Sequence, residues 1–193
     1  MSRKEPAQVR EHRRELLSGV RGRVLELGAG TGANFGFYPR DVGEVVAVEP
    51  EPYLRGKAIE AAASAPVPVT VVDGTADRLP AEDESVDVAV ACLVLCSVPD
   101  QAAALAELRR VLRPGGEVRF YEHVLSETAR VALTQRMIDH LFWPRAFGGC
   151  HTARDTTGAI AEAGFVIEGR RHVQVGPAFV PAATHVLGTA RRA

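Results

Sequence analysis

Short runs of consecutive apolar residues alternate with helical stretches between residues 22 and 123. The runs are rich in β-branched residues and occupy 23–27, 44–49, 68–72, 86–91 and 117–121. Strands that are apolar at consecutive positions are typical of a sheet covered on both faces. Their alternation with helices predicts an α/β fold in which crossover helices join parallel strands.

Helices are predicted between these strands at 33–38, 52–64 and 100–112. In the last of them, Ala103, Leu105 and Leu108 follow helical spacing and predict a buried stripe. Pro114 and the two glycines after it should end this helix and turn the chain into the next strand.

The order of elements changes after residue 123. Helices are predicted at 127–140 and 153–163, and Thr152 with Asp155 resembles a capping box for the second one. Extended segments at 165–175 and 179–189 predict a closing antiparallel pair. The expected fold is a Rossmann-like, doubly wound sheet of seven strands, mostly parallel with an antiparallel last strand.

A helix is also predicted at 5–17, where basic residues outnumber the acids beside them. Because charge runs usually face water, we expect residues 1–20 to form a solvated helical flap. A flap over a bound ligand and a weak contact with a membrane surface are the alternatives.

Length and composition indicate one domain, 1–193, with a small-molecule ligand. Hydrophobic residues at 46% and charged residues at 24% are typical of a soluble domain of this length. The net charge of -1 argues against nucleic acid as a partner, because surfaces that bind phosphate usually leave a basic excess. The oligomeric state is left open.

The cysteines and the apolar runs indicate a cytoplasmic protein. The three cysteines have no paired metal-ligand spacing, so reduced thiols are expected and neither a metal site nor a disulfide is. No apolar run approaches the roughly 20 residues that span a bilayer, and the N-terminus lacks a secretory signal. We therefore expect no integral membrane segment.

The sequence VLELGAGTGAN runs from a buried strand through a glycine loop, residues 26–34. Without Cβ atoms, Gly28 and Gly30 allow the backbone to approach a ligand closely. The pattern also satisfies the loose dinucleotide motif, so the loop alone permits NAD, an adenosyl cofactor or a turn that binds nothing.

Two carboxylates narrow the choice of cofactor. Glu49, followed by Pro50, ends the second strand beside the glycine loop, where a carboxylate can accept hydrogen bonds from both ribose hydroxyls. Glu26 precedes the loop, where an acid can engage the amino end of a methionine moiety. Because a pyrophosphate would prefer an uncharged strand end, Glu26 favours S-adenosylmethionine.

The blocks ELGAGTGAN, VVAVEP, GTADRLPAEDESVDVAV and LRRVLRPGGEV occur in an order and spacing that resemble class I S-adenosylmethionine-dependent methyltransferases. The resemblance covers roughly residues 20–123. It implies a cofactor site, with S-adenosylhomocysteine as the product, formed by Glu26, Gly28, Ala29, Gly30, Asn34, Glu49, Pro50, Thr75, Ala76 and Cys92. Thr75 stands where many relatives have an acid, which implies weaker selection of adenine.

A narrower resemblance follows from TGANFGFYP, CLVLCSVPDQ, LRPGGEVRFYEHV and FGGCHTARD, which are similar to animal methyltransferase-like alkyl thiol S-methyltransferases and their bacterial relatives. It reaches nearly to the C-terminus and implies a thiol acceptor. The animal proteins carry a hydrophobic N-terminal anchor with no counterpart in residues 1–20, so the resemblance does not imply a membrane association for this chain.

Residues 124–150 are expected to form a helical insertion near the acceptor site. His123 follows the fifth strand and is a candidate general base or substrate-orienting group, with a loop-bonded histidine as the alternative. Tyr38, Trp143 and Cys150 are candidates for an apolar acceptor pocket, although each alone is also typical of packing.

We expect methyl transfer to a small molecule, preferably a thiol. An amine, a phenol or quinone-like carbon, and a phospholipid head group remain alternative acceptors. A small NAD-dependent oxidoreductase is a less favoured alternative, because the Leu-Arg-Pro-Gly-Gly block at 112–116 favours a methyltransferase. A module that binds the cofactor without catalysis is the alternative outside the enzymes.

Overall fold

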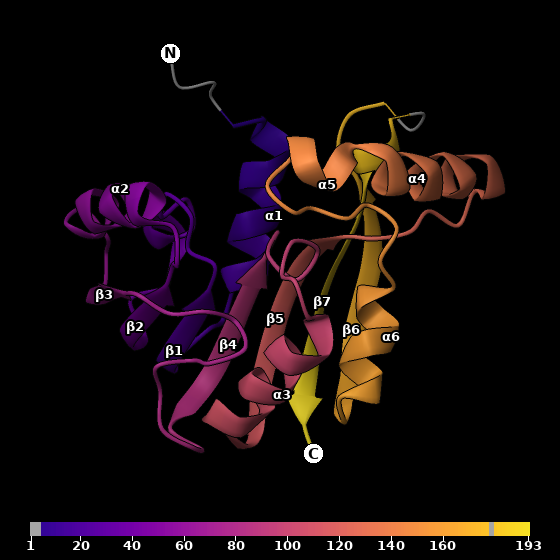
Figure 1. Ribbon diagram of the computed structural model, residues 1–193. Coiled ribbons are helices and arrows are strands. Elements are labelled where there is room, and N and C mark those ends of the chain that lie inside the picture. Colours follow the sequence, from indigo (N-terminus) through magenta and orange to yellow (C-terminus); the bar gives the residue numbers. More distant parts are fainter. Residues whose placement is uncertain (1–4, 178–179) are drawn as a thin grey trace.

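The computed structural model describes residues 5–177 and 180–193 (Figure 1). The expectations for residues 1–4 of the N-terminal flap and for residue 179 in the last extended segment lie outside the described residues.

The described chain forms a seven-stranded sheet in the order β3-β2-β1-β4-β5-β7-β6. Its strands are β1 (Gly22–Leu27), β2 (Val42–Val48), β3 (Val69–Val72), β4 (Val86–Cys92), β5 (Leu112–His123), β6 (Phe165–Gln174) and β7 (Thr184–Arg192). The pairs among β1 to β5 are parallel, whereas β7 runs antiparallel to both β5 and β6. The expected mixed sheet with a reversed last strand is confirmed.

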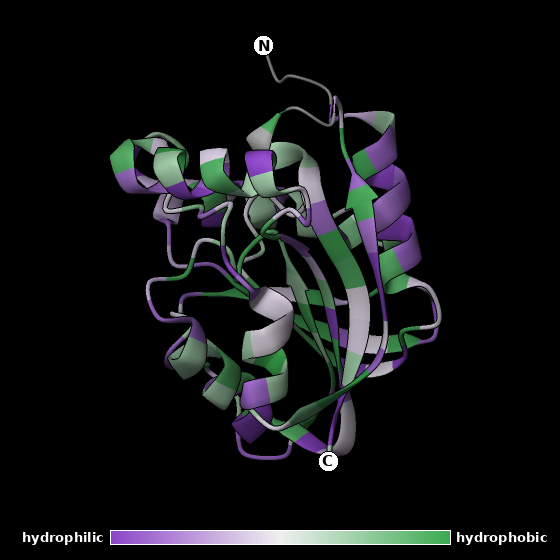
Figure 2. Ribbon diagram, turned by 90° about the vertical axis from the view of Figure 1, so that its right-hand side faces the viewer, coloured by the Kyte–Doolittle hydropathy of each residue, from purple (hydrophilic) through white to green (hydrophobic). Residues whose placement is uncertain are grey.

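Helices cover both faces of the sheet. They are α1 (Ala7–Leu17), α2 (Pro52–Ala62), α3 (Gln101–Val111), α4 (Ala129–Leu141), α5 (Trp143–Ala146) and α6 (Thr156–Glu162), with short 3-10 turns at η1 (Phe35–Phe37) and η2 (Pro181–Ala183). Buried residues of α3 and α6 pack on one face, and those of α1 and α2 pack on the other. Figure 2 shows hydrophobic residues along the inner strands of the sheet and a mixture of hydrophobic and hydrophilic residues along β6.

Helices α4 and α5 lie across the upper end of the sheet in Figure 1, where the parallel strands end. This is the edge at which open α/β sheets bind ligands. No helix of the described residues is long and apolar enough to cross a bilayer.

Three local predictions were wrong. The helix expected at 33–38 is only the 3-10 turn η1, because Tyr38 stands before Pro39 and is extended, with a ψ of 131°. Strand β5 begins at Leu112, earlier than expected, since Leu112 pairs with Val86 of β4. Asp155 itself caps α6 by accepting from the Gly158 amide.

The expectation that the first helix is solvated is wrong for one of its faces. Leu16 and Leu17 of α1 are buried in the core, and Arg13 is only 8% exposed. The Arg13 guanidinium donates to Glu5, Asn34 and Cys92. The helix therefore joins the glycine loop to the core, a role that a count of charges does not reveal.

Glu122 anchors the loop that follows β4. Its carboxylate has no exposed surface and accepts hydrogen bonds from the backbone amides of residues 94, 95 and 96 at 2.9 to 3.1 Å. Burial raises the pKa of this carboxyl group, although the three amides act in the opposite direction. Residue 122 thus positions the loop rather than facing the solvent.

Replacing this carboxylate should destabilise the fold. Glu122→Ala leaves three buried amides without an acceptor, and we expect the free energy of unfolding to fall by about 3 kcal/mol or more in urea denaturation. Glu162→Ala, at an exposed position, should change it by less than about 0.5 kcal/mol. Similar losses in the two variants would contradict the anchoring role.

Candidate functional site

A cavity of about 720 Å³ opens at the carboxyl edge of the sheet. Its volume is in the range of small-molecule sites. It is lined by Leu27, Gly28, Gly30, Glu49, Pro50, Glu51, Leu54, Gly74, Thr75, Ala76, Asp77, Leu93, Val94, Ser97, Val98, Pro99, Asp100 and Gly148.

The glycine loop leaves room for a ligand at this edge. Gly28 has a φ of 64°, and a Cβ there would lie 2.3 Å from the Val94 side chain. Gly30 has a φ of 57°, and a Cβ there would meet no protein atom within 4 Å. Gly28 therefore permits close packing on the β4 loop, and the space over Gly30 belongs to the cavity.

Glu49 follows β2 and places its carboxylate against the glycine loop. One oxygen accepts from the Gly30 amide at 2.7 Å and the other from the Glu51 amide at 3.0 Å. The side chain is 6% exposed and lines the cavity. Since each carboxylate oxygen accepts more than one hydrogen bond, acceptor capacity remains for a ligand's hydroxyl groups.

Glu26, at the end of β1, is held in a buried network beside the loop. Its oxygens accept from Asn34 at 2.9 Å and from the Tyr38 hydroxyl at 2.6 Å. Burial raises the pKa of Glu26 from 4.5 to about 7, while these donors and the charge of Arg13 act in the opposite direction. Arg13 also donates to the Asn34 side-chain oxygen at 2.7 Å.

The far end of the cavity is lined by Thr75, Ala76 and Asp77. A hydrogen bond from the Thr75 side chain lowers the pKa of the Asp77 carboxyl group. Asp77 was not among the predicted site residues. It supplies a carboxylate two positions after Thr75, the residue that replaces the acid of many relatives.

On the other side of the β4 loop, Cys96, His123 and Cys150 come together. The two sulfur atoms are 3.7 Å apart, and each lies 3.5 Å from Nδ1 of His123. The hydrogen bond with Cys96 lowers the pKa of the Cys150 thiol, and His123 acts in the same direction. The indole of Trp143 acts on the Cys150 pKa in the same direction.

These three side chains could hold a metal ion, contrary to the expectation from cysteine spacing. They come from the loop after β4, from the end of β5 and from the segment between α5 and α6. Paired spacing along the chain cannot detect ligands that three separate segments contribute.

The predicted cofactor residues fall into two groups. Gly28, Gly30, Glu49, Pro50, Thr75 and Ala76 line the cavity. Glu26, Ala29, Asn34 and Cys92 are buried behind it. Cys92 accepts a hydrogen bond from Arg13 at 3.0 Å. The roles predicted for these residues remain predictions, although their placement is consistent with one ligand site.

The predicted acceptor residues are not all together. His123 and Cys150 are in contact, and Trp143 belongs to the same cluster. Tyr38 is 3% exposed and its hydroxyl donates to Glu26, so it positions that carboxylate and is not among the residues that line the 720 Å³ cavity. Sequence reasoning missed Arg13 and Asp77. The basic run in the first helix was a signal for Arg13, and no pattern in the sequence pointed to Asp77.

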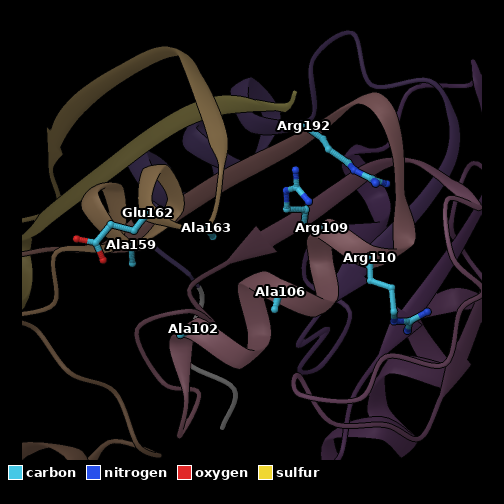
Figure 3. Close-up of a pocket in the computed structure, with 8 residues that line it drawn as sticks. All are labelled: Ala102, Ala106, Arg109, Arg110, Ala159, Glu162, Ala163 and Arg192. Atoms are coloured by element: carbon cyan, nitrogen blue, oxygen red, sulfur yellow. The ribbon is translucent and has the colours of Figure 1, made fainter.

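A second hollow of about 410 Å³ lies between α3 and α6, away from these groups (Figure 3). Its floor contains alanines from both helices, and its edge contains Arg110 and Arg192. Arg110 is paired with Glu107 and Asp83, and Arg192 is paired with Glu84. None of the predicted cofactor or acceptor residues is among those that line this hollow, so it is not the candidate site.

Comparison with known proteins gives a matching family model and similar curated proteins. Residues 25–120 match the methyltransferase domain family. Human thiol S-methyltransferase TMT1A is 34% identical over 95% of this chain and 79% of its own length. Mouse thiol S-methyltransferase TMT1B is 36% identical over 90% of this chain and 73% of its own length.

Solved structures share the fold. A putative methyltransferase from Bacillus halodurans superposes with a TM-score of 0.76 and 16% identity, over 97% of this chain and 99% of that one. A geranyl diphosphate methyltransferase solved in complex with S-adenosylmethionine superposes with a TM-score of 0.69 and 16% identity, over 97% and 85%. At these identities the likeness concerns the fold alone.

The raised pKa of Glu26 predicts a pH-dependent stability. Between pH 4.5 and about 7 the folded chain retains a proton that the unfolded chain has released, so its stability falls as the pH rises. Glu26→Gln cannot lose this proton. The unmodified chain should therefore lose up to about 3 kcal/mol of its free energy of unfolding between about pH 5 and about pH 8, whereas the variant should not show this loss.

Urea denaturation across this pH range measures the difference between the two proteins. In Glu60→Gln, at an exposed position of α2, the free energy of unfolding should change with pH as it does in the unmodified chain. A difference between Glu26→Gln and the unmodified chain that stays constant with pH would show that Glu26 titrates normally.

Proposed function

This chain belongs to the class I S-adenosylmethionine-dependent methyltransferases, and we propose that it transfers the methyl group of that cofactor to a small-molecule thiol. The observation that supports the thiol is the extent of the likeness. The methyltransferase domain match ends at residue 120, but the thiol S-methyltransferase TMT1A aligns over 95% of the chain. The similarity therefore includes the segment that contains Trp143 and Cys150.

The cavity fits the cofactor. We propose that Glu49 accepts hydrogen bonds from the ribose hydroxyls, because its carboxylate is fixed at the rim by two backbone amides. Thr75, Ala76 and Asp77 would lie along the adenine, where Asp77 offers the acceptor for the adenine amino group. The open space over Gly30 is where a side chain would collide with the cofactor.

Glu26, which is buried behind the cavity, is proposed to engage the amino end of the methionine moiety through water. An ammonium group near this buried carboxylate would favour its charged form, since opposite charges stabilise each other most strongly away from water. Asn34 and Tyr38 hold the carboxylate in place, and Arg13 orients Asn34.

When bound, the cofactor supplies a methyl group on a positively charged sulfur. The protein's part is to align the acceptor with that group and to exclude water. We propose that residues 124–150, whose helices α4 and α5 lie over the sheet edge, cover the acceptor (Figure 1). His123 would orient the acceptor rather than act alone as a base, because Nδ1 already contacts both cysteines.

A thiol acceptor is compatible with a site that offers no strong base. A thiol near its reference pKa of about 8.5 is partly ionised at neutral pH, so the reaction needs no strong base. The buried cysteines are free, which is consistent with a reducing compartment, and we propose the cytoplasm as the location.

A panel of acceptors tests the proposal. The protein is incubated with labelled cofactor and alkyl thiols, amines, phenols or phospholipids, and labelled products are counted. Thiol turnover with little transfer to the others is expected. Turnover of amines or phenols with silent thiols would contradict the thiol, and binding of cofactor without transfer to any acceptor would indicate a non-catalytic module.

The ribose contact has its own test. Glu49→Ala should weaken the binding of S-adenosylhomocysteine by at least about tenfold in calorimetry, because each hydrogen bond to a charged group contributes roughly 1.5 to 3 kcal/mol. Glu60→Ala, an exposed substitution on the neighbouring helix, should leave the affinity unchanged. Equal affinities in the Glu49 variant and the unmodified protein would place the ribose elsewhere.

A further inference from the structure

The cluster of Cys96, His123 and Cys150 has the composition of a soft-metal site. It joins two thiols and one imidazole, and among the described residues no fourth His, Cys, Asp or Glu side chain belongs to the group. Both thiols are nearly buried, and His123 is partly exposed. Catalytic zinc sites characteristically have three protein ligands and leave the fourth position for water or substrate.

The distances within the cluster match tetrahedral zinc. With Zn–S bonds of about 2.3 Å and a Zn–N bond of about 2.05 Å, tetrahedral angles put two sulfurs about 3.8 Å apart and sulfur about 3.6 Å from nitrogen. The cluster has 3.7 Å between its sulfurs and 3.5 Å from each sulfur to Nδ1 of His123. The distances between the three ligand atoms are therefore those of a tetrahedral zinc site.

Backbone contacts hold the ligand-bearing segments together before any ligand binds. The Glu122 carboxylate accepts from the Cys96 amide, and the Cys96 carbonyl accepts from the His151 amide at 2.7 Å. The Asp139 carboxylate accepts from the amides of residues 152 and 153, just after Cys150. Such support is what a preorganised metal site requires.

The cluster adjoins the cofactor cavity. Ser97 and Gly148 line that cavity, and they lie one and two residues from the cluster cysteines. The hydroxyl of Ser97 is 3.6 Å from the Cys96 sulfur. A ligand added to the cluster therefore lies next to the space proposed for the cofactor.

We propose that Cys96, His123 and Cys150 bind one zinc ion, whose fourth position takes the sulfur of the acceptor thiol. The metal site stands on the cluster geometry alone, whereas its role in acceptor binding rests on the proposed thiol function. A zinc ion with two thiolates and a neutral imidazole has no net charge, so an added thiolate keeps its negative charge and remains nucleophilic.

The step balances. The acceptor R–SH releases its proton to solvent and binds as thiolate, since a thiol coordinated to zinc is deprotonated. Its sulfur electron pair forms the new S–CH3 bond as the bond between the methyl group and the cofactor sulfonium breaks. The products are the neutral thioether R–S–CH3 and neutral S-adenosylhomocysteine sulfur. The thioether, a weaker ligand than a thiolate, leaves the metal.

Metal content of the full chain is the first test. The protein is purified without a polyhistidine tag, and its zinc is measured by mass spectrometry; we expect one zinc per chain. After removal of the metal with a chelator, added Co²⁺ should give the intense near-ultraviolet absorption of cobalt–thiolate bonds. A protein that contains no zinc and binds neither zinc nor cobalt would overturn the proposal and leave a hydrogen-bonded thiol network.

Variants locate the ligands. Cys96→Ser, Cys150→Ser and His123→Ala should each lose bound zinc and the cobalt–thiolate absorption. Cys92→Ser, which also removes a buried thiol, and His140→Ala, at an exposed position, should retain one zinc per chain. Circular dichroism identifies any variant that fails to fold. If all cluster variants fail to fold, the zinc content of the unmodified chain decides whether the metal site exists. Retention of zinc by folded cluster variants would contradict the assignment.

The acceptor role is separated from the thiol function by the metal-free protein. Loss of thiol methylation on zinc removal, with recovery when zinc is restored and unchanged S-adenosylhomocysteine affinity, is the expected result. Full thiol methylation without metal would overturn the acceptor role while the thiol function stood. Stoichiometric zinc with no transfer to any thiol would refute the thiol function and leave the metal site in place.

Discussion

The site depends on three buried carboxylates that must be satisfied by hydrogen bonds. Burying a charged group without partners costs several kcal/mol, so each carboxylate fixes the segment that supplies its donors. Glu26 holds Asn34 and Tyr38, Glu49 holds the Gly30 amide, and Glu122 holds the loop after β4. All three stand at or next to the carboxyl ends of strands, and so they shape one edge of the sheet.

This arrangement separates the proposed donor side from the proposed acceptor side. Glu49 lines the cavity proposed for S-adenosylmethionine and Glu26 lies behind it, whereas Glu122 supports the loop that contains Cys96. Helix α1 joins the donor side through Arg13, which contacts both Asn34 and Cys92. The N-terminal helix is thereby part of the support for the cofactor site, and its buried face explains why a helix with so many charges packs against the sheet.

The sheet was predictable because its strands are short, apolar at consecutive positions and separated by helices. Glu49 could be placed for the same reason, since a residue that ends a parallel strand must reach the common edge. Asp77 and Arg13 could not be placed in this way. Asp77 lies in a loop whose path no periodicity describes, and Arg13 is one of several arginines on a helix whose inward face depends on what it packs against.

The sequence by itself determined the α/β sheet and the chemistry of the donor, because glycines and acids at the ends of successive strands lie close together in any parallel sheet. Only the tertiary structure brought together the residues of the proposed acceptor side. Cys96, His123 and Cys150 belong to three separate segments, and no spacing along the chain relates them. They meet because β4 and β5 are neighbours and because the segment after α5 folds back onto the β4 loop, held by the hydrogen bond between His151 and Cys96.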